Sequence, residues 1–448
     1  MRLRAPFILS LILWFNHSVV AQDSLNKSGG AFSGEWRTFY LNTFNKGELK
    51  DYYGLATGGK IKYVYSLGEH FKLGGAAYTS LNLGIQDLSI PDPITGKFSR
   101  YESGLFNVQD YNDRFIFILG ELFVRYTSPK HELTLGRMKL ATPWINPEDG
   151  RMIPTLAQGL WYTYQPQRKY KLQLGVLNAI GVRSTNGFFN IGESIGKYPL
   201  GRNPDGSPSL YAGNTESDYI AIANLDIQPL DFIKVELWNY YVDHVFNTSY
   251  LRPVIDLDDR GTKLSLEWMH QERVGEGGNS VDSLRYFTDE RANVLGVQLE
   301  FKVSKTNLTF AYDHILDGGR FLFPREWGRE PLFSFQKRER SEGTANSHAV
   351  VYTFDRTFPL NKDKLQSIIS IGHHWKPPVT NAADNKYAMP DYTHLNLDFF
   401  YHNDKVKRLK PELLLTYKMG SGNYPEHPNF IINKVDMFQI NFIVNYNF

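Results

Sequence analysis

The C-terminal stretch 438–448 reads FQINFIVNYNF. Every second residue from Phe438 to Phe448 is apolar, and most of the residues between them are Gln or Asn. Side chains of a β-strand point alternately to opposite faces, so one face of this stretch lies in an apolar medium and the other meets water. The end of the chain is therefore predicted to be a two-faced strand.

The same alternation recurs along the chain. It is clear in residues 61–65, 264–268, 295–303 and 395–399, where Leu, Ile, Val, Tyr, Phe or Trp alternate with polar residues or glycine. Helical spacing and helix-capping patterns are hardly seen. The sequence therefore predicts an all-β protein.

The composition of the 448 residues excludes several classes of protein. The formal net charge of +2 provides no basic excess for neutralising phosphates, so we expect no nucleic-acid partner. The absence of cysteine excludes disulfide scaffolds, cysteine-ligated metals and thiol catalysis. Aromatic residues make up 15% of the chain although its mean hydropathy is only −0.38. Such a chain is too polar on average for a helical membrane protein.

The N-terminus has the pattern of a secretory signal peptide. Arg2 and Arg4 precede an apolar run, Phe7–Phe15, and small residues end at Ala21. We expect cleavage near Ala21, since the apolar run is shorter than the ~20 residues that a membrane anchor needs. Residues 22–448 then form one domain with 47 basic and 47 acidic residues. This domain contains no run of about 18 apolar residues, so it is either a soluble β-protein or a membrane β-barrel.

Three features favour the barrel. Many alternating segments reach the length of about 10 residues that a tilted strand needs to cross a bilayer. Aromatic residues such as Trp36, Tyr164, Trp238 and Trp375 lie near strand ends, which suits the interfacial girdles of outer-membrane barrels. No repeat of propeller-blade length is present. We therefore expect a transmembrane antiparallel β-barrel in a Gram-negative outer membrane, with both termini periplasmic.

The strand number follows from the connections, because outer-membrane barrels alternate short periplasmic turns with long outer loops. Short turns are expected at 68–70, 128–130, 166–168, 227–230, 257–259, 304–305, 359–363 and 403–407, and long loops between them. The alternation fails after residue 242 unless Phe246–Asp256 is an additional descending strand, reached through a tight outer turn near Asp243. With this strand the count is 18, and 16 is the alternative if two weak segments are loops. Barrels of this size enclose an aqueous channel.

Residues 136–155 read GRMKLATPWINPEDGRMIPT and are followed by Gly159, and residues 317–324 read DGGRFLFP. The first stretch resembles the third-loop region of OprD-like porins, and the second resembles a later loop of that family. The order of strands and turns from Asp231 to Phe448 is also similar. The resemblance implies an 18-stranded, substrate-selective, passive channel that is monomeric or trimeric. It also implies a pore lined by an arginine ladder, which often passes small carboxylate-bearing solutes.

The third loop, 140–154, is the first candidate site. On the resemblance, it folds into the lumen and constricts the pore, where mixed charges set ion selectivity. The candidate lining residues here are Arg137, Lys139, Glu148, Asp149 and Arg151. The alternative is an ordinary solvated loop.

A second set of candidates lies in loop 317–342 and on the wall. The loop combines alternating charges with aromatic residues, so it can line the vestibule as a lid. It can equally be a surface loop held by its own ion pairs, or one that binds lipopolysaccharide phosphates. Its candidates are Arg320, Arg325, Glu326 and Arg329, and the inward wall positions are Lys263, Glu300 and Lys302.

The leading functional interpretation is a porin for passive, substrate-preferring diffusion of small polar or charged solutes. The alternatives are a fatty-acid-type or other transport barrel, an outer-membrane enzyme barrel, and a secreted glycan-binding β-protein. No catalytic triad spacing, zinc-protease motif or nucleotide-binding motif is present, and His373 and His374 point to opposite faces of a strand. We therefore expect no enzyme activity, metal or cofactor, with membrane lipid and lipopolysaccharide as the surrounding partners.

Overall fold

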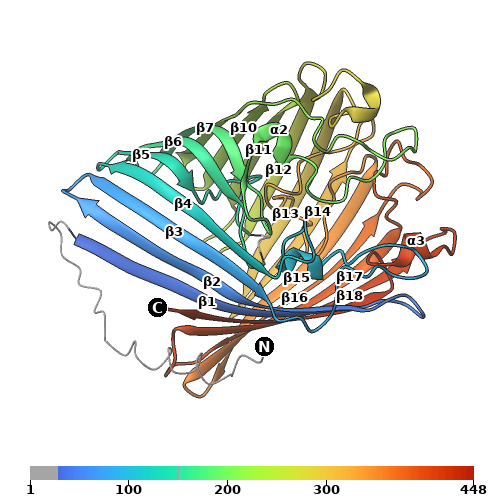
Figure 1. Cartoon of the computed structure of the whole chain (residues 1–448). Helices are drawn as coiled ribbons and strands as arrows, with labels where there is room; N and C mark the ends of the chain where they lie inside the picture. Colours follow the sequence, from blue (N-terminus) through green and yellow to red (C-terminus); the bar gives the residue numbers. More distant parts are fainter. Residues whose placement is uncertain (1–28, 149–150) are drawn as a thin grey trace.

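The computed structural model describes residues 29–148 and 151–448, so the predicted signal peptide, residues 1–21, and the candidate Asp149 lie outside the described residues. The described strands form one closed antiparallel sheet, a β-barrel (Figure 1). The strands are β1 Gly29–Phe44, β2 Tyr52–Leu67, β3 Phe71–Asn82, β4 Phe115–Thr127, β5 His131–Met138, β6 Leu156–Gln167, β7 Tyr170–Gly181, β8 Phe188–Asn190, β9 Ile220–Leu230, β10 Ile233–Val242, β11 Phe246–Asp256, β12 Lys263–Arg273, β13 Arg291–Val303, β14 Thr306–Ile315, β15 Ser347–Leu360, β16 Asp363–Trp375, β17 Asp391–His402, β18 Leu409–Ser421 and β19 Met437–Asn447. Short β8 pairs with the end of β7 as an addition to the barrel, and the other eighteen confirm the predicted strand number.

The C-terminal strand closes the barrel. β19 pairs with β1 from Phe44↔Phe438 to Glu35↔Asn447. Its apolar side chains face outward, as shown by the 46% exposure of Phe442, whereas Asn441 is fully buried on the lumen side. The alternation in the sequence thus arises because one face of the strand contacts lipid and the other faces the lumen.

The connections confirm the predicted alternation. β10 and β11 are joined by a tight turn at residues 243–245. β11 has the bounds, Phe246–Asp256, of the additional strand that the alternation of short and long connections required. The eight expected short connections lie at the rim where the chain ends at Phe448, and the long loops lie at the opposite rim. This arrangement is that of an outer-membrane barrel with a periplasmic C-terminus.

Among the described residues, helical structure is confined to short turns in the outer loops. These are η1 Glu102–Leu105, α2 Ile191–Ser194, η2 Asp282–Leu284 and α3 Pro428–Ile431. Within residues 29–148 and 151–448, no helix is both long and apolar enough to cross a membrane.

The glycine pair Gly58-Gly59 in β2 marks a close approach of two strands. Gly59 has a φ of 136°, and a Cβ there would lie 1.8 Å from the carbonyl oxygen of Glu35 on β1. A larger residue cannot occupy this position without moving the strand.

Candidate functional site

The third loop, residues 139–155, folds into the lumen as predicted. Trp144 is 1% exposed and stacks on Phe323 with ring centroids 4.9 Å apart. Its edge also contacts Phe321 and Tyr250, whose side chain points inward from β11. The loop starts at the end of β5 and reaches Tyr250 of β11, so it projects into the barrel interior.

Loop 316–346 folds inward as well and is joined to the third loop. Asn146 donates from its backbone N to the carbonyl of Trp327 (3.1 Å) and from Nδ2 to the carbonyl of Arg329 (2.8 Å). The guanidinium of Arg329 forms an ion pair with Glu148. These two charged candidates therefore meet inside the barrel, at the contact between the two loops.

Residues 333–339 of the same loop follow the inner wall over successive strands. Their partners on the wall are Glu267 on β12, Asp313 on β14, Ser370 on β16, Asp398 on β17, Glu412 and Lys418 on β18, and Asn441 on β19. Lys337, for example, lies 2.5 Å from Asp398 and 3.0 Å from Glu412. The charged residues of this loop thus form hydrogen bonds and ion pairs with polar residues of the inner wall. The sequence left its orientation undecided.

A buried ion cluster fixes the end of this segment. Glu339 accepts from Lys418 on β18 and from Arg100 of loop 83–114 (3.2 Å). Burial alone raises the pKa of Glu339, but the charges of Lys418 and Arg100 outweigh it and hold this pKa well below its usual range. The cluster therefore stays ionised and ties two loops to the wall.

Loop 83–114 is a third inward loop, which the sequence identified only as long. Its turn η1 is buried, and Leu105 and Phe106 pack with Leu41 and Tyr52 of the first two strands. Glu102 accepts hydrogen bonds from Thr43 (2.5 Å) and Ser99 (2.6 Å). No pattern of apolar and polar residues in this segment of the sequence distinguished it from an exposed loop.

The packing of loop 83–114 is expected to depend on pH. Burial raises the pKa of Glu102 from 4.5 to about 7. Its contribution to stability is therefore complete below pH 4.5 and is lost as the pH rises through 7. Protease cleavage within the loop should be faster at about pH 8 than at about pH 5. In Glu102→Gln, which does not ionise, the two rates should be equal, and equal rates in the unmodified protein would contradict the prediction.

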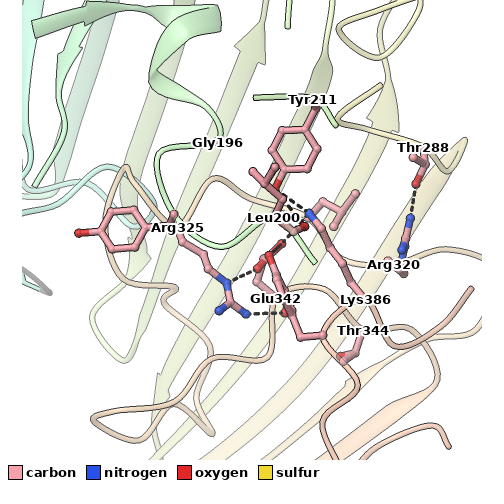
Figure 2. A network of polar contacts seen from close by, with 12 residues as sticks. Gly196, Leu200, Tyr211, Thr288, Arg320, Arg325, Glu342, Thr344 and Lys386 are labelled. Atoms are coloured by element: carbon pink, nitrogen blue, oxygen red, sulfur yellow. Dashed lines mark hydrogen bonds and ion pairs between the residues drawn. The ribbon is translucent and has the colours of Figure 1, made fainter. Parts of the chain in front are cut away.

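Three predicted lining residues instead hold the outer loops together. Arg320 is 1% exposed and donates to Thr288 and to the carbonyls of Arg202 and Ala382. Arg325 pairs with Glu342 at 2.6 Å, close to the buried Lys386, as Figure 2 shows. Glu326 accepts hydrogen bonds at Oε1 from the backbone N–H groups of Gly196 and Tyr198 in loop 182–219.

The remaining third-loop candidates, Arg151 and Arg137, lie in different places. Arg151 is 7% exposed and lies against Gly104 beneath loop 83–114, where Arg37 donates to its carbonyl. Arg137 shares the outward face of Leu133 and Leu135, which are exposed on the outside of the barrel. Arg137 therefore faces away from the lumen.

The wall beside the inward loops is basic. Lys60 and Lys62 alternate with the outward Ile61 and Tyr63, and Lys62 pairs with Glu121 at 2.5 Å. Lys139 is accessible to solvent inside the barrel, where the surrounding protein partly desolvates its ammonium group. This desolvation and the like charge of nearby Lys60 both lower the pKa of Lys139. Within the described residues, neither Lys60 nor Lys139 has a carboxylate at ion-pair distance.

Lys263, Glu300 and Lys302 lie on the inner wall nearer the periplasmic turns. Lys263 pairs in register with Glu300, and its ammonium is 3.5 Å from Asp256. Lys302 is one residue from the end of β13. These residues therefore lie on the lumen-facing wall near the periplasmic turns, away from the inward loops.

A closed barrel with a polar lumen, narrowed by loops that fold inward, defines an outer-membrane porin. The family model described as "outer membrane porin, OprD family" matches residues 110–356. The chain therefore belongs to the OprD family, whose members are porins of the Gram-negative outer membrane, and it allows passive, substrate-preferring diffusion of small solutes.

The barrel is also similar to solved structures of that group. OpdK of Pseudomonas aeruginosa, solved with vanillate, aligns with a TM-score of 0.69 at 14% identity, over 94% of this chain and 98% of that one. OccD3 (OpdP) of the same organism gives 0.68 at 15% identity, over 95% and 93%. OccAB3 of Acinetobacter baumannii gives 0.69 at 13% identity, over 94% and 99%. No curated protein matches the chain.

Proposed function

We propose that this porin prefers small anionic solutes, carboxylates among them, and performs no covalent chemistry. The observation that carries the proposal is the pair of lumen ammonium groups, Lys60 and Lys139, which lie beside the inward loops and form no ion pair among the described residues, although Glu35 lies opposite Lys60 on the neighbouring strand. Fixed charges at a narrow point of a pore attract counter-ions and set selectivity. The vanillate in the OpdK structure is a small carboxylate and supports this choice of solute class.

The passage lies between two surfaces. One is the wall formed by β1, β2 and the end of β5, which carries the lysines. The other is formed by the joined loops, where Arg329 pairs with Glu148. On the outside, we propose that the band of exposed apolar side chains contacts membrane lipid and lipopolysaccharide.

The test is the reversal potential of single channels in planar bilayers under a KCl gradient. We expect the unmodified channel to prefer chloride. Lys60→Gln/Lys139→Gln should lower the chloride-to-potassium permeability ratio by about threefold or more, because it removes two fixed charges at the constriction.

Lys302→Gln is the matched control, because it removes a lysine near the periplasmic turns and should leave the ratio unchanged. A cation-preferring unmodified channel would contradict the proposal. So would a double variant with an unaltered reversal potential. Vanillate added to one side should also reduce the chloride current of the unmodified channel more than that of the double variant.

A further inference from the structure

The barrel wall has a window above the end of β5. β4 pairs with β5 only from Leu122↔Arg137 to Thr127↔Glu132, because β5 ends at Met138. Residues 115–121 of β4 therefore have no strand partner on that side among the described residues. β5 has 8 residues, fewer than the about 9–11 that a tilted strand needs to cross a bilayer. The window thus opens within the apolar band.

Side chains close this window. Arg137 donates from Nη1 to the carbonyl of Leu119 on the unpaired edge of β4 (3.2 Å) and from Nε to Gln158 (3.0 Å). Its guanidinium lies 4.3 Å from the ring centre of Phe188. Leu156 fills the space beside Gly120, where a Cβ would lie 2.5 Å from Cδ1 of Leu156. Rotating these side chains breaks no strand pairing, whereas opening any other seam of the barrel does.

Most side chains at the window are apolar; the charged ones are Arg137 on the outside and, on the lumen side, Glu121, which accepts from Tyr78 and Lys62. On the outside, Phe117 and Leu119 of β4 are 57% and 41% exposed. On the lumen side lies a buried apolar cluster. Its members are Ala76, Tyr78, Ile116, Ile118, Ile153 and Leu156. A channel wall for polar solutes needs no such lining, and the cluster continues the lipid-facing surface through the wall.

We propose that this window is a lateral port, through which an anionic amphiphile passes between the membrane and the lumen. Arg137 faces outward on the lipid side, and a guanidinium binds a carboxylate through charge-assisted hydrogen bonds. The apolar chain then lies along Phe117 and Leu119 and enters past Leu156. The port is separate from the anion preference of the axial passage, because it uses neither Lys60 nor Lys139.

A disulfide across the window tests the port. The chain has no cysteine, so Gly120→Cys/Leu156→Cys contains the only two thiols. The probe is dodecanoate carrying a diazirine at its chain end, added to the double variant in lipid vesicles and photolysed. Mass spectrometry then maps the labelled residues. In the reduced protein we expect label on outward Phe117 and on inward Tyr78. In the oxidised protein the label on Phe117 should remain and the label on Tyr78 should fall to background.

Two results would overturn the port. Equal labelling of Tyr78 in both redox states means that the probe reaches the lumen along the axis. Labelling of Phe117 no stronger than that of Leu395 on the fully paired strand β17 means that the window does not hold the probe. Heat-dependent gel migration and unchanged ion conductance of the oxidised protein show that the barrel itself is intact.

The head-group role of Arg137 is tested separately with Arg137→Gln. Loss of a charge-assisted contact should reduce dodecanoate labelling of Phe117 by about tenfold. A neutral probe, dodecanol with the same diazirine, should label the variant as well as the unmodified protein. If both probes lose labelling equally, Arg137 only seals the window and does not bind the carboxylate.

Discussion

Trp144→Ala is expected to raise the single-channel conductance by about twofold or more, since it releases the loop that projects into the lumen. Trp144 is buried between Phe321 and Phe323 of one inward loop and Tyr250 of β11. Truncating a buried tryptophan costs about 3–5 kcal/mol. The contact between the third loop and loop 316–346 therefore weakens, and the passage beside them widens.

Trp144→Phe is the matched control. The indole Nε1 has no hydrogen-bond partner among the described residues, so phenylalanine keeps the ring contacts and loses no hydrogen bond. Its conductance should be close to that of the unmodified channel. Planar-bilayer recording at one salt concentration checks both variants. A Trp144→Ala channel with unchanged conductance would show that the third loop does not limit the current.

The wall of this barrel was predictable because lipid and water impose a period of two on each strand. Strand parity alone located Phe246–Asp256, which contains Arg252 and Pro253 and is a weak strand by composition. Parity works because a strand missing from a closed barrel would put every later turn on the wrong side of the membrane.

The constriction was predictable only in part, because charges in a loop do not reveal their partners. Arg329 and Glu148 do meet inside the barrel, but Arg320 binds carbonyls of two other outer loops, and Arg325 pairs with Glu342 of its own loop. Arg137 was assigned to the lumen from its neighbours in the sequence. In β5, however, Arg137 lies two residues after the outward-facing Leu135, so strand alternation places it on the lipid side.

Lys418→Met is expected to detach loop 316–346 from the wall. The side chains of Lys418 and Glu339 are 0% and 2% exposed, so the variant leaves a buried carboxylate that keeps Arg100 but has lost its closest ammonium partner. Removing one partner of a buried ion pair costs about 3–5 kcal/mol. We expect faster protease cleavage within residues 333–342 and noisier single-channel currents.

The double variant Lys418→Met/Glu339→Gln separates the charge from the packing. Replacing both partners of a buried ion pair is often close to neutral, and the amide oxygen of the glutamine can still accept from the partly exposed Arg100, so most of the protease resistance lost in Lys418→Met should return. Lys46→Ala removes a half-exposed lysine whose partners are Asp436 and Glu426, and it should change little, because surface ion pairs contribute about 0–1 kcal/mol. If the double variant is cleaved as fast as Lys418→Met, then the methylene contacts of Lys418, and not its charge, hold the loop. The ion cluster would then have no part in keeping the constriction closed.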